Sequence, residues 1–390
     1  MHPIIIIGSG FAGYTLAREF RKLDSTSPLI IITSDDGRSY PKPMLSNALS
    51  KGKTADQLSL SSAEAMEKTL NATVITDSVV EHIDPQQQTV TISNASPLHY
   101  KQLVLALGAT PIRNVLDGNA TNNVLSINNL SDYSTFRKQL VDAKHVTIIG
   151  PGLIGCEFAN DLINSGITVS VIGPSKLPMD TLLPAPIASE LKATLSKAGV
   201  DWYLESTVIA INHATSSDLN MDGYQLSLSN GDLIHADIVI SAIGLRPDIE
   251  LANAMGITVN RGIVTDEYLQ TNQPNIYALG DCAEVTGHNL LYIAPILAAA
   301  KALAKTLSGL TTAVKYPAMP VAIKTPDYPL VVAAPALVET GSWQFESAPS
   351  GFGIKGVFTN DNNALLGFVL SGDMVSEKQA LTKQLPDIIA

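Results

Sequence analysis

Two glycine-rich hexapeptides carry the clearest chemistry in the sequence. The first, GSGFAG, places Gly8, Gly10 and Gly13 directly after the apolar run at residues 4–7, which is typical of a buried parallel strand. The first glycine suits a tight turn, the second admits a pyrophosphate close to the backbone, and the third lets a helix pack on the strand. A diphosphate would meet free N–H groups and the positive end of the helix dipole there. An ordinary strand-to-helix turn is the alternative for such a hexapeptide taken alone.

The chain repeats this unit in its second quarter. GPGLIG places Gly150, Gly152 and Gly155 after a strand expected at residues 146–149, and a helix is expected to follow towards residue 164. Two such units in one chain favour a protein that binds two dinucleotides.

An acidic side chain about 20 residues beyond the glycines accepts hydrogen bonds from the ribose in this type of fold. Asp35 is the candidate in the first unit, with Ser34 beside it; a solvated turn is the alternative reading of this segment. The strand expected at 168–172 in the second unit ends in Gly173 and lacks the acid. It also lacks an arginine cluster for a 2′-phosphate, so the sequence favours NADH over NADPH.

Three further charged residues follow strands or open helices near these motifs. Lys42 lies in the stiff loop SYPKPMLSN, where it would place positive charge beside an electron-rich ring, or would simply be exposed. Glu157 lies in the first turn of the second unit's helix, where the helix dipole favours its charge with or without a functional role. Asp281, at the end of the ALGD segment, can accept from backbone amides and from a polyhydroxy chain.

Composition limits the class of protein. The 390 residues are 45% hydrophobic and 16% charged, which indicates a soluble globular protein of two or three domains. The net charge of −11 argues against a nucleic-acid partner. No run approaches the roughly 18 apolar residues of a membrane span, and no basic segment precedes the first strand as in a signal peptide. Two cysteines predict neither a disulfide framework nor a metal cluster. We therefore expect a cytoplasmic protein.

The order of the motifs resembles that of the two-dinucleotide flavoprotein reductases related to glutathione reductase. Two GxGxxG units are followed by AIGLRP and ALGD, with GATP between the two units, and the resemblance covers essentially the whole chain. It implies an α/β fold with two Rossmann-like dinucleotide-binding domains and a small C-terminal α+β domain. The expected limits are 1–112 and 237–316 for a discontinuous FAD domain, 113–236 for an NAD(H) domain, and 317–390 for a domain that covers the flavin and forms a docking surface.

One departure from glutathione reductase bears on function. That branch carries a redox-active CxxxxC pair soon after the first unit, where this chain reads YPKPMLSN. Cys156 and Cys282 lie inside the nucleotide motifs, where small buried cysteines are the default. Without a dithiol the flavin itself must deliver the electrons, and a flavin can pass them singly to a metalloprotein. A direct NADH oxidase would need a cysteine at the flavin, and this loop has none.

The pattern YxKPxLS and the chain length resemble the ferredoxin-reductase-like branch. DDGRSYPKPMLS, GLIGCEFANDL, YALGDCAE and VAIKTPDYPLVV resemble bacterial rubredoxin reductases, which feed rubredoxin in alkane hydroxylation. The resemblance implies rubredoxin reduction by NADH through FAD. Alternatives are a reductase of a ferredoxin or of the rubredoxin domain of a nitric oxide reductase, and a flavin-binding NADH sensor without fast turnover.

The same resemblance assigns roles to individual residues. It implies that Asp281 binds the ribityl chain, that the Val80 backbone meets the adenine, and that Glu157 lies near the nicotinamide and the flavin. Lys42 and Lys324 would lie near the flavin, and a structural salt bridge is the alternative for Lys324. The expected catalytic residues are Lys42, Glu157 and Lys324, and the expected cofactor-binding residues are Gly8, Ser9, Gly10, Phe11, Ala12, Gly13, Ser34, Asp35, Lys42, Val80, Gly108, Gly150, Gly152, Gly155, Glu157, Gly280, Asp281, Ile293 and Lys324.

Docking of the acceptor poses an electrostatic problem. Rubredoxins are typically acidic and so is this chain, so a local basic or apolar patch must bring the two together. The candidate cations are Arg18, Arg21, Lys22, Lys42 and Lys301. We expect weak, transient docking.

Overall fold

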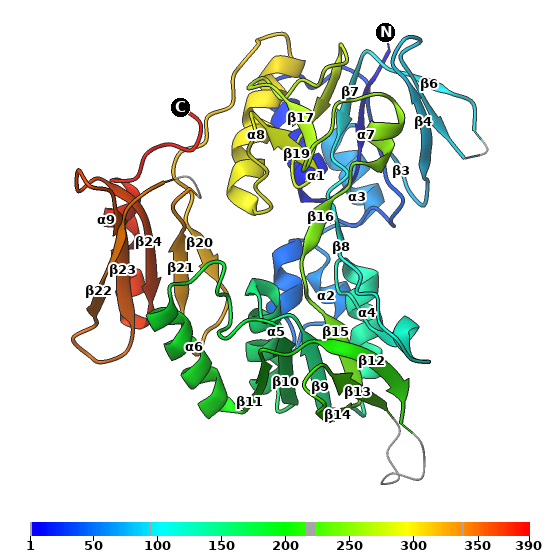
Figure 1. Cartoon of the computed structure of the whole chain (residues 1–390). Helices are drawn as coiled ribbons and strands as arrows, with labels where there is room; N and C mark the ends of the chain where they lie inside the picture. The colour runs from blue at the N-terminus through cyan, green and yellow to red at the C-terminus, as the bar shows by residue number, and fades with distance from the viewer. Residues whose placement is uncertain (1, 94, 215–222, 337–338) are drawn as a thin grey trace.

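The first glycine motif lies at the carboxyl end of the central strand of a parallel sheet. The computed structural model describes residues 2–93, 95–214, 223–336 and 339–390. Its first sheet has the order β18-β7-β1-β2-β3. The strands are β1 (Ile4–Ile7), β2 (Leu29–Ile32), β3 (Thr73–Ile75), β7 (Gln102–Leu105) and β18 (Ile276–Ala278). Helices α1 (Phe11–Arg21) and α8 (Ile293–Leu307) pack against each other beside this sheet (Figure 1). β1 is buried along its length, as its uninterrupted isoleucines predict.

The second glycine motif has the same setting in a second parallel sheet of order β11-β10-β9-β15. Its strands are β9 (His145–Ile149), β10 (Thr168–Gly173), β11 (Val200–Leu204) and β15 (Ile238–Ser241). The helices of this unit are α4 (Leu130–Gln139), α5 (Leu153–Ile163) and α6 (Ala185–Ala198). An antiparallel sheet of β12 (Val208–His213), β13 (Tyr224–Leu228) and β14 (Leu233–Ala236) lies beside it.

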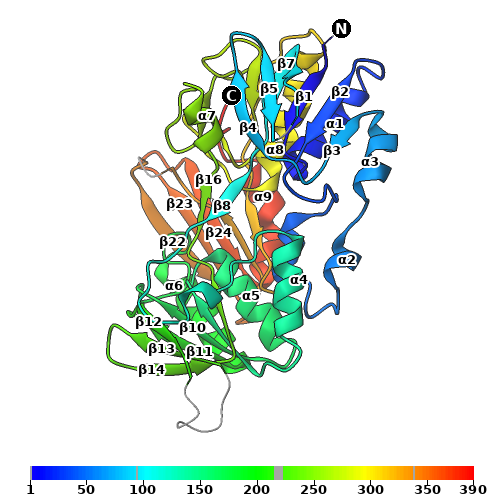
Figure 2. The ribbon, with the colours of Figure 1, turned by 90° about the vertical axis from the view of Figure 1, so that its right-hand side faces the viewer.

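Two short antiparallel strands, β8 (Ala109–Pro111) and β16 (Leu245–Pro247), connect the two units. They lie side by side between the units in Figures 1 and 2. The return to the first unit expected at residue 237 is wrong, because β15 pairs in parallel with β9 and so belongs to the second sheet. The chain crosses back only at β16; the other domain limits stay a prediction.

The C-terminal part is an antiparallel sheet followed by a short helical segment. Its strand order is β20-β21-β24-β23-β22. The elements are β20 (Val321–Ile323), β21 (Leu330–Ala333), β22 (Ser342–Ser347), β23 (Ile354–Thr359), β24 (Leu365–Ser371), the 3₁₀ helix η3 (Gly372–Glu377) and α9 (Lys378–Thr382). This domain lies next to α6 (Figure 1). The Tyr328 hydroxyl donates to a carboxylate oxygen of Glu190 on that helix.

The remaining elements are short. They are η1 (Lys42–Asn47), α2 (Ala55–Leu58), α3 (Ala63–Leu70), β4 (Val80–Asp84), β5 (Thr89–Ile92), β6 (Leu98–His99), η2 (Thr121–Asn123), α7 (Glu250–Ala254), β17 (Ile263–Thr265) and β19 (Ala283–Val285). Among the helices in the described ranges, none is long and apolar enough to cross a membrane.

Candidate functional site

A cavity of about 1760 Å³ extends between the two glycine motifs. Both motifs, the loop after β2, η1, the start of α8 and the segment after β20 line it. It is larger than the range of roughly 300–1,000 Å³ typical of single small-molecule pockets. Every residue expected from the sequence to bind a cofactor lines this cavity, except Gly13, Gly155 and Gly280.

These three glycines have packing roles instead. A Cβ atom on Gly13 would lie 1.9 Å from the carbonyl oxygen of its motif's first glycine, and the same distance applies to Gly155 in the second motif. Each therefore lets a helix approach its strand, as the motif predicts. Gly280 has a φ of +82°, and a Cβ there would lie 2.8 Å from that of Ala12. They shape the cavity wall without facing it.

The first glycine loop is built to receive a diphosphate. Gly8 has a φ of +112°, which the tight turn requires, and its N–H donates to the Ile32 carbonyl at the end of β2 at 2.8 Å. Gly10 has open space around the position of a Cβ, and within the described residues α1 has no side-chain cap on its first N–H groups. The Ser9 hydroxyl donates to Thr33 Oγ1 at 2.9 Å, which ties the loop to the end of β2. The residues present therefore fit the diphosphate of FAD. Thr33 was not among the residues expected from the sequence to bind a cofactor.

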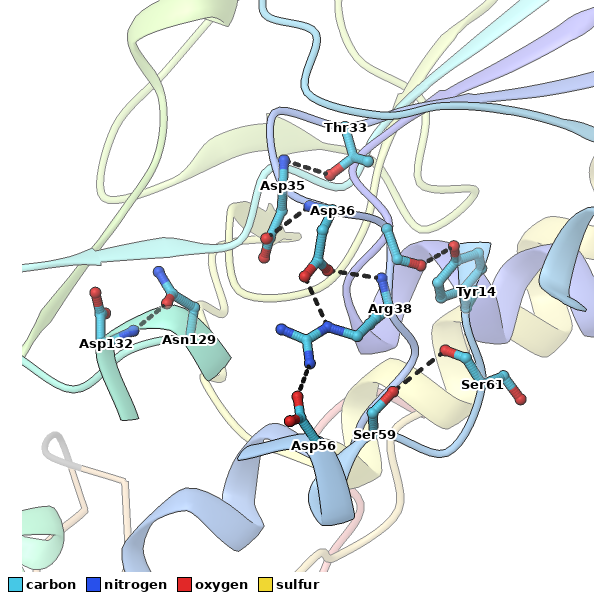
Figure 3. A network of polar contacts seen from close by, with 11 residues as sticks. Tyr14, Thr33, Asp35, Asp36, Arg38, Asp56, Ser59, Ser61, Asn129 and Asp132 are labelled. Atoms are coloured by element: carbon cyan, nitrogen blue, oxygen red, sulfur yellow. Dashed lines mark hydrogen bonds and ion pairs between the residues drawn. The ribbon is translucent and has the colours of Figure 1, made fainter. Parts of the chain in front are cut away.

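A polar network surrounds the adjacent end of the cavity (Figure 3). Asp35 lines the cavity, and its backbone N–H donates to Thr33 Oγ1 at 3.2 Å. Arg38 also lines the cavity; its guanidinium bridges Asp36 at 2.7 Å and Asp56 at 2.9 Å. Arg38 was not singled out in the sequence, because its second partner, Asp56, lies 18 residues further along the chain. This end offers a carboxylate and a fixed cation to an adenosine group.

Lys42 and Asp281 face a second part of the cavity. Burial lowers the pKa of Lys42, and the nearby carboxylates of Asp281 and Asp132 raise it. Burial raises the pKa of Asp281, and the positive charge of Lys42 opposes that shift. Each group thus favours the charged form of the other, although both pay for leaving water.

A buried ion pair joins three segments at the centre of the site. Glu157 on α5 is 1% exposed, and its Oε1 accepts from the Lys324 backbone N–H at 2.8 Å. Its Oε2 accepts from Lys324 Nζ and from the Ser46 hydroxyl, and Lys324 Nζ lies 3.0 Å from that hydroxyl. The salt bridge that was the alternative for Lys324 is present, and all three residues line the cavity. Ser46 was not singled out, although it is the last residue of the YxKPxLS pattern.

Helix α5 makes further polar contacts with the two segments that supply Ser46 and Lys324. The Asp161 carboxylate accepts from the backbone N–H groups of Leu49 at 2.8 Å and Ser50 at 3.0 Å, just after η1. Asn160 donates to Asp327 at 2.6 Å, just after Lys324. These bonds hold η1 and the segment after β20 against α5, and so keep Ser46 and Lys324 beside Glu157.

The second glycine loop repeats the geometry of the first. Gly150 has a φ of +112° and donates to Ile172 at 2.8 Å. The segment that follows β10 folds back over this loop, and the Met179 N–H donates to the Pro151 carbonyl at 2.9 Å. Ser175 and Asp180 of this segment line the cavity. The second unit thus offers the same cradle for a dinucleotide.

The cysteines are buried free thiols. Burial raises the pKa of both, and that of Cys282 rises to about 12. A thiol held neutral in this way is a poor nucleophile. Among the residues that the structure describes, no group of three or more His, Cys, Asp or Glu side chains is placed to hold a metal ion.

The five cations expected in a docking patch are dispersed. Arg18 donates to Ser39, and Arg21 donates to backbone carbonyls at the end of α3. Lys22 pairs with the neighbouring glutamate of its own helix at 2.6 Å. Lys42 faces the cavity, and Lys301 is exposed on α8. The structure therefore does not bring the five together as one patch.

Comparison with known proteins agrees with this geometry. Residues 2–306 match the family model described as pyridine nucleotide-disulphide oxidoreductase, and residues 313–385 match a rubredoxin binding C-terminal domain. The chain is 45% identical over 389 residues to a rubredoxin-NAD(+) reductase of Alcanivorax borkumensis, with 100% of each chain covered. It is 36% identical over 383 residues to a nitric oxide reductase FlRd-NAD(+) reductase of Aliivibrio fischeri, with 98% of each covered.

A solved structure shows the same fold. The crystal structure of a covalent putidaredoxin reductase–putidaredoxin complex matches with a TM-score of 0.87 at 24% identity, covering 99% of this chain and 94% of the other. Two dinucleotide cradles that share one cavity, together with the match over residues 2–306, place this chain in the pyridine nucleotide-disulphide oxidoreductase family.

Proposed function

We propose that this chain is an NADH-dependent flavoprotein reductase that passes electrons from NADH through FAD to rubredoxin. The observation that carries the proposal is that one cavity is lined by both glycine motifs and by Lys324, which comes from the segment matching a rubredoxin binding domain. The relative at 45% identity over the full length is a rubredoxin-NAD(+) reductase. The buried cysteines leave no thiol relay, so the flavin is the outlet for the electrons.

The first unit would hold FAD with groups that need little rearrangement. These residues line the cavity: the N–H groups at the start of α1 would bind the diphosphate, Asp35 would accept from the adenosine ribose, and the Val80 backbone would meet the adenine. Asp281 would accept from the ribityl hydroxyls, and Lys42 would supply positive charge that stabilises the reduced ring. FAD, when bound, supplies the conversion of a two-electron hydride donor into single-electron delivery.

The second unit would hold NADH, and the ion pair would position its nicotinamide. Glu157 follows the second glycine loop on α5, and Lys324 and Ser46 lock its carboxylate in one orientation. Hydride transfer between the two rings needs no general acid or base of the protein. The role of these three residues is therefore to fix the wall of the cavity and to exclude water.

The C-terminal domain and the neighbouring helix α8 would together carry the docking face. Lys378 at the start of α9 and Leu297 on α8 both line the cavity, and Lys301 is exposed one turn beyond Leu297. These residues supply the local basic and apolar surface that an acidic chain needs to meet an acidic partner. Because the patch is small, we expect weak binding and a rate that falls as salt is added.

An anaerobic two-carrier experiment tests the proposal. NADH-reduced protein is mixed with oxidised rubredoxin or with a plant-type ferredoxin, and loss of the iron centre's visible absorption is followed. Fast bleaching of rubredoxin alone supports the proposal; a flavin that accepts hydride but reduces neither carrier refutes the partner assignment. Lys378→Glu should slow rubredoxin reduction at low salt, whereas Lys197→Glu, on the exposed end of α6, should not.

A second acceptor is favoured by one observation. The 36% identity to a nitric oxide reductase FlRd-NAD(+) reductase makes the rubredoxin domain of such an enzyme the competing partner. Adding that domain as a third carrier separates the two, because the preferred acceptor should be reduced with the higher second-order rate constant.

We place the chain in the cytoplasm and in electron supply to alkane hydroxylation, on its resemblance to the bacterial rubredoxin reductases. Reconstitution with rubredoxin and an alkane hydroxylase tests the pathway.

A further inference from the structure

The end of β10 cannot carry the acidic residue that usually selects NADH. A Cβ atom on Gly173 would lie 2.2 Å from Pro151 Cδ and 2.4 Å from its Cγ. Contacts this short between a Cβ and a rigid ring are not tolerated. As long as Pro151 occupies the second position of GPGLIG, no side chain fits at Gly173. Discrimination between NADH and NADPH must come from elsewhere in the second unit.

The segment after β10 brings another acid to the cavity beside the second glycine loop. Met179 is 2% exposed, has a φ of +53°, and donates its N–H to the Pro151 carbonyl at 2.9 Å. The N–H groups of Leu182 and Leu183 each donate to the Met179 carbonyl at 2.8 Å. This buried turn anchors the segment to the glycine loop. Asp180 follows the anchor directly, is exposed, and lines the cavity.

The charge at this end of the cavity is negative. Residues 150–181 all belong to the described part of the chain, and the charged residues among them that line the cavity are Glu157 and Asp180. Glu157 is buried and paired with Lys324. Lys176 is exposed and is not among the lining residues. A 2′-phosphate in the second unit would meet an acid and no compensating cation from this segment.

We propose that Asp180 is the residue by which the second unit selects NADH over NADPH; this rests on the proposed function, in which that unit binds the nicotinamide dinucleotide. Its carboxylate accepts from a ribose hydroxyl of NADH, the role that the strand-end acid has in other dinucleotide folds. It repels the phosphate that NADPH carries on the same ribose. In this chain the ring of Pro151 leaves no room for a side chain at the end of β10. The acid is supplied instead by Asp180, in the loop that is hydrogen-bonded to the Pro151 carbonyl.

Two measurements on the FAD-loaded protein test this. Calorimetry compares the binding of 5′-AMP with that of adenosine 2′,5′-bisphosphate, and anaerobic stopped-flow compares flavin reduction by NADH and NADPH. Asp180→Asn should tighten bisphosphate binding and raise kcat/KM for NADPH about tenfold, with a loss of about two- to fivefold for NADH. Asp180→Arg should shift the preference further towards NADPH. Asp142→Asn removes an exposed charge of the same unit that does not line the cavity, and should change neither ratio.

Several results would overturn the assignment. It fails if the unmodified protein uses both coenzymes equally, if Asp180→Asn leaves the NADPH to NADH ratio within twofold, or if Asp142→Asn shifts that ratio as much. It also fails if neither adenosine nucleotide binds. If neither coenzyme reduces the flavin and Asp180→Asn still shifts the bisphosphate to AMP ratio, the proposed function is wrong and the role of Asp180 in reading the 2′ position stands.

Discussion

The ion pair between Glu157 and Lys324 makes an asymmetric prediction about stability. Lys324→Met would leave the Glu157 carboxylate at 1% exposure without its cation, with only the Ser46 hydroxyl and one backbone N–H as donors. Glu157→Gln would instead leave an ammonium whose side chain is 27% exposed and can turn towards water. Removing the lysine should therefore cost more than neutralising the glutamate.

The magnitudes follow from the burial of each group. Removing one partner of a fully buried pair costs roughly 3–5 kcal/mol. Because Lys324 is partly exposed, we expect the low end, about 3 kcal/mol, for Lys324→Met. Glu157→Gln loses one charge-assisted hydrogen bond, which is worth about 1.5 kcal/mol when the donor can reach water. The double variant leaves no unpaired charge and should cost about 2 kcal/mol, which is about 2.5 kcal/mol less than the two single changes together; that difference is the coupling between the two positions.

Denaturant unfolding of the FAD-loaded proteins measures this cycle, provided that all four have the same m-value. Lys22 and Glu19, an ion pair of similar chemistry on the exposed side of α1, supply the control. A cycle on that pair should give a coupling of at most about 0.5 kcal/mol. The reasoning is refuted if the Glu157 and Lys324 cycle is also additive within 0.5 kcal/mol, or if Glu157→Gln costs more than Lys324→Met.

Two further predictions concern the first unit. Gly13→Ala should destabilise the protein by about 2–3 kcal/mol, because its Cβ would lie 1.9 Å from a carbonyl oxygen. Gly10→Ala should keep the stability of the unmodified protein, because its Cβ has open space, but should lose FAD affinity. An equal loss of stability for the two variants in melting curves would contradict this. Burial lowers the pKa of Lys42 and Asp132 raises it, so Asp132→Asn should lower that pKa further. Lys42 would then lose its proton at lower pH, and the alkaline limb of NADH-driven flavin reduction should move to lower pH. Lys42→Met should abolish that limb, and a limb that stays in place would rule out Lys42 as its origin.

The elements around both glycine motifs could be predicted because their signals are local. In both units the glycines directly follow the apolar run that forms the strand, β1 or β9. Each glycine meets one steric requirement of the motif, so the pattern can be recognised in the sequence. The membership of β15 could not be predicted in the same way. A buried parallel strand looks the same whichever sheet it joins, so the sequence before the AIGLRP segment gave no sign that it pairs with β9.

The missed residues of the site have their partners far away in the chain. Ser46, which was missed, meets Glu157 across 111 positions. Lys324 was expected near the flavin from the family resemblance, but its contact with Glu157, across 167 positions, was not predicted. A single serine or arginine belongs to no sequence motif that would predict such distant contacts. Arg38 and Asp180 were not singled out either, because what gives each a role is the cavity beside it, which forms only when both units are folded.

The position of Lys324 links the two halves of the proposed reaction. It follows β20, in the segment that matches a rubredoxin binding domain, yet its ammonium and its backbone N–H both bind the glutamate that follows the second glycine motif. Lys378 of the same domain lines the cavity as well. The domain that would receive the acceptor therefore also builds the wall of the cofactor site. Exchanging this domain between related reductases to change the acceptor should disturb flavin reduction too, unless Ser46, Glu157 and the lysine are kept as one unit.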